Sequence, residues 1–302
     1  MRIAIIGCGS LGCYFGAKLS EKNEVIYIDT FKKSVDNLNN FGITIKENDK
    51  TKNYKADAFL TSRYDQPVDL VILAVKSTQN VAALNENKAL LNEHTLVLSL
   101  QNGFGNEREI SRFVDKENII LGNTLINFAT DEEGCVKKTG DGETIIGNAQ
   151  GNKKNALILK VLLNQAGFET EISDDIYRVV WEKMFVSATL NPVTALFNCK
   201  IKVVYENKNI WQIVETLAEE LVKVAAADGY DFTLDKVLEL IKTSIFNIGK
   251  GYTVMHQDVL NKRFTEIEKI NGAILSLAYK HKIDAPYNEF VLNSIKAIEK
   301  LY

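Results

Sequence analysis

MRIAIIGCGSLGCYFGAKL, residues 1–19, joins a short apolar run to three closely spaced glycines. Residues 3–6 are all apolar and lead directly into Gly7, Gly9 and Gly12, which form a G-x-G-x-x-G pattern. More apolar residues follow the last glycine of the pattern. A strand, a glycine-rich turn and a helix in this order predict the first βα unit of a parallel sheet.

The glycine pattern predicts a dinucleotide site when an acidic residue closes the next strand, and Asp29 does so at the end of EVIYID. Gly7 permits a tight turn, Gly9 lets the backbone approach a pyrophosphate, and Gly12 allows close packing of helix and strand. The other loop residues, at the helix N-terminus where N–H groups lack partners, are Cys8, Ser10 and Leu11. A glycine turn without a ligand is the alternative, and this context favours the nucleotide site.

Composition and charge exclude several classes of protein. The chain has 302 residues, 46% of them hydrophobic and 25% charged, with a formal net charge of -3 and no basic cluster, so nucleic acid is not an expected partner. No apolar stretch approaches the roughly 20 residues that span a bilayer, and the first apolar run is too short for a signal peptide. We therefore expect a cytoplasmic enzyme without a membrane partner. The widely spaced cysteines are expected to be reduced thiols, and no metal site is predicted.

Two hydrophobic periods divide the chain. Apolar runs near 2–6, 24–29, 68–74, 95–99 and 119–125 alternate with helical patterns, which predicts a parallel α/β sheet. From about Asp174 onward, apolar residues recur at steps of three and four, which predicts helices. The sequence thus predicts a Rossmann-type dinucleotide-binding domain over 1–173 and an all-helical substrate and catalytic domain over 174–302.

Polar residues follow two of the predicted strands. Lys76 comes directly after the apolar run of residues 69–75, and Asn102 with Gly103 comes after the next strand. Ligands of open α/β sheets bind where strands end, so these residues are candidates to contact cofactor or substrate. A solvated lysine and an ordinary Asn-Gly turn are the alternatives, and without further context they are favoured.

A polar stripe crosses an apolar helix in the second half. Lys183, Ser187 and Asn191 are four residues apart and project from one helix face. Pro192 has no N–H, so we expect a kink and an unsatisfied carbonyl at Ala188. A lysine among apolar neighbours is costly unless it is paired or has a lowered pKa, which favours a functional role over a solvent-facing row.

Together these motifs resemble the ketopantoate reductase family, the 2-dehydropantoate 2-reductases, which reduce a 2-oxo acid with a nicotinamide cofactor. The resemblance covers the glycine pattern and five further stretches: AVKS, QNG, GETIIG, EKMFVSATLNPVTAL and MHQDVLNKRFTEIEKING. It implies a Rossmann domain and a helical domain with substrate in the cleft between them. It also implies a general acid at Lys183, substrate ligands at Asn191 and Glu266, and residues that position nicotinamide and substrate at Lys76 and Asn102.

The implied roles agree with the chemistry of carbonyl reduction. Hydride delivery to a ketone leaves an alkoxide, which a nearby ammonium such as that of Lys183 can stabilise and protonate. Glu266 lies beside an apolar helical stripe, where a charge at the edge of a solvated face is the alternative reading. The resemblance instead favours a carboxylate that accepts a hydrogen bond from the product hydroxyl and keeps Lys183 charged.

Three positions depart from the family pattern. Ser187 stands where an asparagine is more common, and Val254 stands where a serine commonly helps to hold the substrate carboxylate, with Thr253 one residue too early. Many members of the family hold NADPH with an arginine close after the second strand, whereas this chain has Asp29 at the end of that strand. An aspartate favours a free ribose hydroxyl and repels a 2′-phosphate. The neighbouring Lys32 and Lys33 could offset that repulsion if Asp29 turned toward solvent.

These observations predict an enzyme that reduces a 2-oxo acid. The first candidate substrate is ketopantoate, whose product pantoate is a precursor in pantothenate and coenzyme A biosynthesis. An NAD-dependent D-2-hydroxy-acid dehydrogenase of the same family is one alternative, and a non-catalytic dinucleotide-sensing protein is another. The cofactor is NADP(H) by resemblance or NAD(H), which Asp29 favours. Ser187 joins the substrate ligands because it shares a helix face with Lys183 and Asn191. The sequence leaves the oligomeric state open, a homodimer included.

Overall fold

The structure, a computed structural model, describes residues 1–132, 134–249 and 251–302. The chain divides into two compact units, of which the first contains Met1–Gln101 and Asn106–Val179 and the second contains Asn102–Gly105 and Val180–Tyr302. The boundary predicted at residue 173 lies shortly before the division at Val179. The inclusion of Asn102–Gly105 in the second unit was not predicted, because no change of composition marks these four residues.

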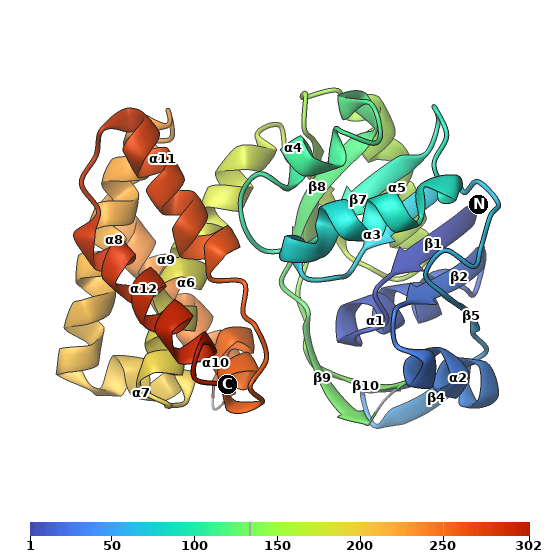
Figure 1. Ribbon diagram of the computed structural model, residues 1–302, viewed down its shortest axis with the longest axis horizontal. Helices are drawn as coiled ribbons and strands as arrows, with labels where there is room; N and C mark the ends of the chain where they lie inside the picture. Colours follow the sequence, from blue (N-terminus) through green and yellow to red (C-terminus); the bar gives the residue numbers. More distant parts are fainter. Residues whose placement is uncertain (133, 250) are drawn as a thin grey trace. The chain divides into compact units, whose positions relative to one another are not determined.

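A sheet of eight strands runs through the first unit (Figure 1). Its order is β12-β11-β8-β7-β6-β1-β2-β5, and all neighbours are parallel except β8 and β11. The strands are β1 (Arg2–Ile6), β2 (Glu24–Asp29), β5 (Asp57–Leu60), β6 (Leu70–Leu73), β7 (Leu96–Ser99), β8 (Ile119–Thr124), β11 (Thr144–Asn148) and β12 (Thr170–Ile172). The five strands predicted from the sequence are all present, with small differences at their ends.

Both faces of this sheet are buried. Ile3 and Ile5 of β1 belong to one hydrophobic core, and Ala4 and Ile6 belong to the other. Because successive side chains of a strand point to opposite faces, a strand that is apolar throughout must be covered on both sides. The helices of this unit are α1 (Ser10–Leu19), α2 (Lys32–Phe41), α3 (Asn80–Glu86), α4 (Asn106–Ile110) and α5 (Lys153–Gln165).

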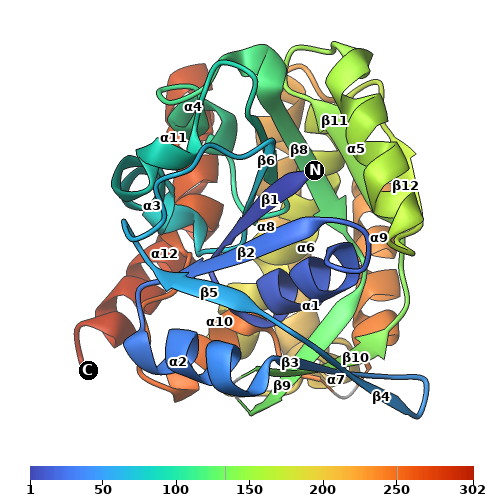
Figure 2. The same cartoon turned by 90° about the vertical axis from the view of Figure 1, so that its right-hand side faces the viewer.

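A second sheet of four strands belongs to the first unit and is absent from the prediction (Figure 2). Its order is β4-β3-β10-β9. The strands are β3 (Ile43–Glu47), β4 (Lys50–Tyr54), β9 (Asn127–Glu132) and β10 (Cys135–Gly140). Asn48 and Asp49 connect β3 to β4 with positive φ angles of 49° and 58°, which is typical of a tight hairpin.

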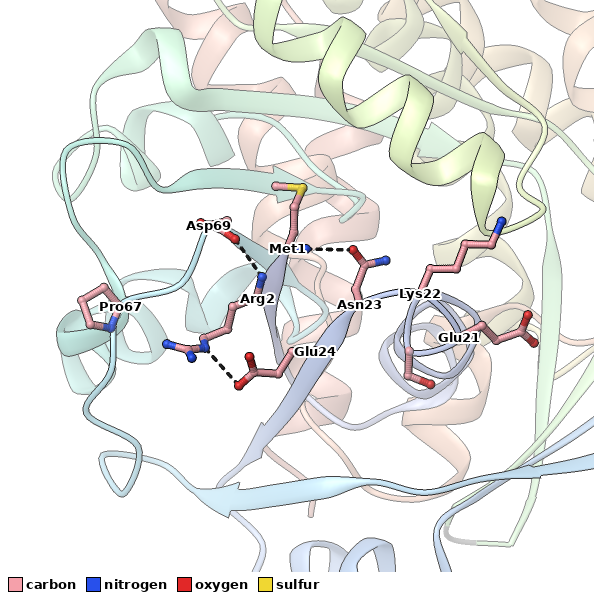
Figure 3. A pocket seen from close by; sticks show the side chains of 9 residues that line it. Met1, Arg2, Glu21, Lys22, Asn23, Glu24, Pro67 and Asp69 are labelled. Atoms are coloured by element: carbon pink, nitrogen blue, oxygen red, sulfur yellow. Dashed lines mark hydrogen bonds and ion pairs between the residues drawn. The ribbon is translucent and has the colours of Figure 1, made fainter.

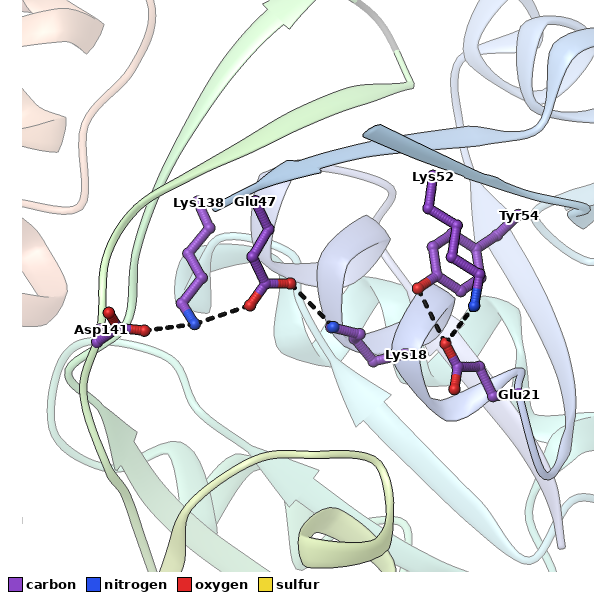
Figure 4. Close-up of polar contacts among 7 residues, drawn as sticks. All are labelled: Lys18, Glu21, Glu47, Lys52, Tyr54, Lys138 and Asp141. Atoms are coloured by element: carbon purple, nitrogen blue, oxygen red, sulfur yellow. Dashed lines mark hydrogen bonds and ion pairs between the residues drawn. The ribbon is translucent and has the colours of Figure 1, made fainter. Parts of the chain in front are cut away.

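A row of charges joins helix α1 to the small sheet (Figure 4). Glu47 accepts from Lys18 Nζ and from Lys138 Nζ at 2.9 Å each, and Lys138 also pairs with Asp141 at 2.6 Å. Burial alone would raise the pKa of Glu47, but the hydrogen bonds from Lys18 and Lys138 outweigh burial and lower this pKa below its ordinary value. The small sheet is therefore anchored to the helix that follows the glycine loop.

The second unit is built from helices, as predicted. Their buried side chains form a hydrophobic core of their own, to which Leu217, Leu221 and Val224 contribute. The helices are α6 (Ile176–Leu196), which begins just before the division between the units, α7 (Ile201–Glu206), α8 (Lys208–Ala227), α9 (Leu234–Ile248), α10 (Val254–Leu260), α11 (Ala273–His281) and α12 (Pro286–Glu299), with a π-helical turn η4 (Glu268–Gly272). Among the described residues, no helix is long and apolar enough to cross a membrane.

Candidate active site

The glycine loop has the geometry of a phosphate cradle. Gly7 has a φ of +101°, and a Cβ added there would lie 2.7 Å from the backbone nitrogen of Val75. A Cβ on Gly12 would collide with the carbonyl oxygen of Gly7, so close packing of α1 on β1 excludes a side chain. A Cβ on Gly9 would meet nothing within 4 Å. The open space over Gly9, at the N-terminus of α1, is where a pyrophosphate can approach.

Asp29 is fixed beside this loop at the end of β2. Its Oδ2 accepts from the backbone N–H of Cys8 at 2.8 Å, and its Oδ1 accepts from that of Phe31 at 3.0 Å. Lys32 pairs instead with Asp36, with the Nζ of Lys32 2.5 Å from a carboxylate oxygen of Asp36. The two backbone bonds hold Asp29 toward the glycine loop, and they oppose the rotation toward solvent that would let nearby lysines receive a phosphate.

A cavity of about 450 Å³ lies over the same strand ends. Its lining includes Gly7, Cys8 and Gly9 from the loop and Asp29 with Phe31 from the end of β2. Ligand pockets usually occupy about 300–1,000 Å³, and in open α/β sheets they lie at the carboxyl ends of the strands. The open Gly9, the carboxylate of Asp29 and this cavity therefore fit the phosphates and ribose of a dinucleotide.

A hollow of about 760 Å³ lies at the amino ends of the same strands (Figure 3). Its polar groups bond to one another, since the N–H of Arg2 donates to Asp69 at 2.7 Å and the guanidinium of Arg2 donates to Glu24 at 3.0 Å. The terminal amine of Met1 donates to Asn23 at 3.1 Å. Although this hollow is larger, it lies at the edge opposite the glycine loop, so the smaller cavity is the better candidate for a nucleotide site.

Lys76 lies in the first unit, next to the glycine loop. It directly follows Val75, whose backbone nitrogen is the close neighbour of Gly7, and its side chain is partly buried. Gln101 fixes this loop from the end of the next strand, because its Nε2 donates to the carbonyl of Val75 and to Asn80 Oδ1, both at 2.7 Å. Neither Gln101 nor Asn80 was singled out from the sequence, although Gln101 belongs to the stretch QNG.

Asn102 belongs to the second unit because the residues after it pack there. Gly103 has a φ of +95°, and a Cβ added to it would lie 2.6 Å from the carbonyl oxygen of Lys269. The N–H of Phe104 donates to that oxygen at 3.3 Å, and the Phe104 ring packs edge-on against Trp181 with centroids 4.7 Å apart. The backbone that follows Asn102 thus lies close to the backbone of Lys269, which places Asn102 beside that segment.

Helix α6 carries the predicted polar stripe without a break. Ser187 is buried, and Lys183 and Asn191 are partly buried. Burial lowers the pKa of Lys183 to about 8, although the negative charge of Glu266 acts in the opposite direction and raises it. Glu266 is only 9% exposed, so it is not a charge on a solvated face. The structure brings Lys183 and Glu266 within electrostatic reach of each other in one unit.

The expectation of an unsatisfied carbonyl at Ala188 is wrong. The side-chain Nδ2 of Asn271, in η4, donates to this carbonyl at 3.0 Å and replaces the N–H that Pro192 lacks. Asn271 is fully buried and was not singled out from the sequence. A proline inside a helix does signal that a donor is needed at the residue four positions earlier, but it does not say which residue supplies it.

Thr253, the residue before Val254, has a structural role. Thr253 caps helix α10, because its Oγ1 accepts from the N–H of His256 at 3.2 Å and shares a hydrogen bond of 2.6 Å with Thr194. This hydroxyl is therefore engaged within the protein. Val254 is 55% exposed and presents an apolar side chain at the start of α10.

Comparison with known proteins identifies the family of the chain. Residues 3–151 match the family model for ketopantoate reductase PanE/ApbA, and residues 175–299 match the model for its C-terminal part. The chain belongs to the ketopantoate reductase family. Among curated relatives of this family, 2-dehydropantoate 2-reductase of Pyrococcus abyssi is 32% identical, and that of Lactococcus lactis subsp. lactis is 30% identical; the matches cover 100% of this chain and 99% of each relative.

A solved structure of D-mandelate dehydrogenase with NADH and anilino(oxo)acetate superposes with a TM-score of 0.95 at 31% identity, and the match covers 99% of both chains. The predicted family, the α/β fold with a helical second half and the class of oxidoreductases acting on CH–OH groups are therefore confirmed. NADH in this neighbour and the family match together indicate a nicotinamide cofactor. The predicted substrate ligands and catalytic residues, Asn102, Lys183, Ser187, Asn191 and Glu266, all lie in the second unit.

Proposed function

We propose that the protein reduces a 2-oxo acid to a 2-hydroxy acid with a nicotinamide cofactor, and that ketopantoate is the first candidate substrate. The observation that carries this proposal is Lys183, with a pKa of about 8 and Glu266 within electrostatic reach, in a chain of the ketopantoate reductase family. A lysine of this kind is partly protonated near neutral pH and able to release its proton, as a general acid requires.

Residues of the first unit hold the cofactor in this proposal. The backbone of Gly7–Leu11 receives the pyrophosphate, and Gly12 keeps α1 close to β1 so that the helix N-terminus faces the phosphates. Asp29 accepts from the ribose hydroxyls, and Lys76 bonds the cofactor at the end of β6. NADH is the expected cofactor, because Asp29 is tied to Cys8 and Phe31 and would meet a 2′-phosphate at close range.

Residues of the second unit bind the substrate and supply the proton in this proposal. A bound reduced nicotinamide would supply the hydride for the carbonyl carbon. Lys183 Nζ stabilises the oxygen as it gains charge and gives it the proton that completes the hydroxyl group. Glu266 accepts from that hydroxyl and favours the charged form of Lys183. Asn102, Ser187 and Asn191 donate to or accept from the polar groups of the acid.

A second candidate function is a D-2-hydroxy-acid dehydrogenase that acts on an acid with an apolar side chain. It is favoured by the similarity to D-mandelate dehydrogenase with NADH and by the fixed position of Asp29. Ser187 is shorter than asparagine, and Val254 is apolar where the family commonly has a serine. Both substitutions reduce hydrogen bonding to a polar substrate such as ketopantoate.

The deciding experiment measures kcat/KM for ketopantoate and a panel of other 2-oxo acids with NADH and with NADPH. Preferred turnover of ketopantoate supports the first function, and preferred turnover of 2-oxo acids with aryl or other hydrocarbon side chains supports the second. Lys183→Met is measured beside the wild type and is expected to turn over every substrate much more slowly. Dinucleotide binding without turnover of any 2-oxo acid would contradict both and favour a sensing protein.

A further inference from the structure

A side chain from a distant segment compensates for the proline inside α6. Pro192 removes the N–H that would bond the carbonyl of Ala188, and Asn271 Nδ2 takes its place at 3.0 Å. The same Nδ2 donates to Asn288 Oδ1 at 3.0 Å. A carbonyl oxygen can only accept, so the contact with Ala188 fixes which end of the amide is the nitrogen, and both amide hydrogens are used.

The bonds continue from Asn271 to a buried carboxylate. Asn288 Nδ2 donates to Glu220 at 2.7 Å, and Glu220 also accepts from the backbone N–H groups of Tyr287 and Asn288 at 2.9 Å each. These N–H groups begin helix α12, where a negative charge is favourable. Asn271 Oδ1 is buried and has no hydrogen-bond partner among the described residues, a cost that an apolar side chain would avoid. The donors of Asn271 are thus the feature that justifies an amide here.

The backbone connects Asn271 firmly to Glu266. The carbonyl of Glu266 accepts from the N–H groups of Lys269 and Ile270 at 2.9 Å and 3.0 Å. The N–H of Gly272 reaches back five residues to the carbonyl of Ile267 at 3.0 Å, which makes this turn π-helical. A contact of Asn271 with α6 therefore also holds the segment of Glu266 against the helix of Lys183.

We propose that Asn271 is a positioning residue that holds the Glu266 segment on α6 and so keeps Glu266 within reach of Lys183. The proposal rests on the proposed function of Lys183 as proton donor. Asn271 itself needs no contact with substrate or cofactor for this role. It acts through the carbonyl of Ala188, which lies on the same helix as Lys183.

The role has a measurable effect on pH dependence. Burial lowers the pKa of Lys183, and Glu266 is the charged side chain that raises it. If the segment of Glu266 loosens, the pKa of Lys183 falls further and the lysine loses its proton at lower pH. The alkaline limb, which is the decrease of kcat/KM for reduction at high pH, must then move to lower pH. Simple destabilisation lowers the melting temperature but leaves this limb in place.

The test compares Asn271→Ala with the wild type. We expect kcat to fall on the order of 10-fold, the KM for the cofactor to stay unchanged, and the alkaline limb to move down by about half a pH unit or more. Asn118→Ala is the matched control, because Asn118 is also buried and its side chain donates to the backbone carbonyl of Glu93 at 2.9 Å in the first unit. In this control the limb should stay in place.

The double variant Pro192→Ala/Asn271→Ala separates positioning from stability and serves if Asn271→Ala does not fold. An alanine at position 192 restores an N–H for the carbonyl of Ala188 within the helix. We expect the melting temperature to recover while the alkaline limb stays shifted. If the limb also returns to its wild-type position, Asn271 only satisfies a carbonyl and the positioning role is wrong.

The outcomes also distinguish this inference from the proposed function. If the wild type has an alkaline limb and Lys183→Met loses turnover, but a folded Asn271→Ala keeps the limb in place, the positioning role alone fails. If Lys183→Met retains turnover, the proton-donor role fails and the positioning role fails with it.

Discussion

Two opposing influences set the charge of Lys183. Burial lowers its pKa to about 8, and Glu266 limits that decrease. Lys183→Met should lower kcat about 10²- to 10⁴-fold, the usual range for a positioned proton donor, and leave the dissociation constant of the dinucleotide nearly unchanged. Steady-state kinetics and calorimetric titration test both parts. Lys202→Met, which removes a half-exposed lysine paired with Glu206, is the control and should keep full activity. Near-normal turnover of Lys183→Met would contradict the assignment of Lys183 as proton donor.

Asp29 determines the expected choice between NADH and NADPH. Asp29→Asn removes the charge that would repel a 2′-phosphate, so the ratio of kcat/KM for NADPH to that for NADH should rise. The ratio is measured in the wild type, in Asp29→Asn and in Asp57→Asn, an exposed aspartate at the opposite end of the neighbouring strand β5. A wild type that already prefers NADPH about tenfold, or an unchanged ratio in Asp29→Asn, shows that Asp29 does not set the preference.

Individual residues were predictable to different degrees. Lys183, Ser187 and Asn191 share a face in the sequence pattern, and Glu266 was assigned only through the family resemblance. The contact of Asn271 could not be predicted, because the carbonyl that accepts from it lies 83 residues away in the chain. Helix periodicity reports neighbours three or four residues apart and carries no information on such contacts.

At the scale of elements, the glycine loop has one position open to a ligand and another closed by packing. Gly9→Val should fold and lose dinucleotide binding, because a side chain there enters free space where the pyrophosphate must lie. Gly12→Val should instead lower the melting temperature, because its Cβ would collide with the backbone of Gly7. Calorimetric titration and thermal unfolding of both variants test the contrast. Unchanged affinity in a folded Gly9→Val protein means that the loop is only a turn.

The charge row of Figure 4 links α1 to the small sheet. Glu47→Gln leaves Lys18 and Lys138 close together without their shared anion, and we expect a loss of about 1–3 kcal/mol, between the values for exposed and fully buried pairs. Glu21→Gln is the matched control, because its pair with Lys52 is largely exposed and should matter little. Urea unfolding measures both free energies, and equal losses would contradict the difference.

The pH dependence of this contribution has a definite sign. The pKa of Glu47 is lower in the folded protein, so its contribution is complete above the pKa of the unfolded chain and is lost as pH falls through the folded value. The difference in stability between the wild type and Glu47→Gln should therefore shrink in acid. A difference that stays constant down to about pH 3 would contradict the ion pairing.

Elements defined by local period were predictable, and elements defined by distant pairing were not. The strands β1, β2 and β6 are continuous apolar runs, so the sequence indicates them directly. The small sheet pairs β3 with β10, far apart in the chain, and its strands are mostly half-exposed. The turn at Asn48 and Asp49 was not singled out from the sequence either, although these residue types favour the positive φ angles of a hairpin.

For the whole molecule, the proposed role of Lys183 as proton donor predicts that the direction of reaction depends on pH. In that role, reduction needs the protonated lysine, and oxidation of the hydroxy acid needs the neutral one. With a pKa of about 8, kcat/KM for reduction should fall above that pH and the value for oxidation should rise. Initial rates in both directions between about pH 6 and 10 provide the measurement. Profiles that rise or fall together would show that another group controls the proton.

The division into two units was predictable in outline, because the hydrophobic period changes from alternating strands and helices to helices alone. The family resemblance extends almost from end to end, so it indicated both units at once. The place of Asn102–Gly105 was not predictable, because it depends on contacts of Phe104 with Trp181 and of Gly103 with Lys269.

That loop has a consequence for attempts to separate the halves. The chain passes from one unit to the other after Gln101, after Gly105 and again after Val179. A fragment that starts at Val180 would lack Phe104, and it would uncover Trp181, which is fully buried in the intact chain. A chimaera that joins the first unit of one family member to the second unit of another therefore also places residues 102–105 of the first member in the helical unit of the second. Those four residues must be matched to their new neighbours.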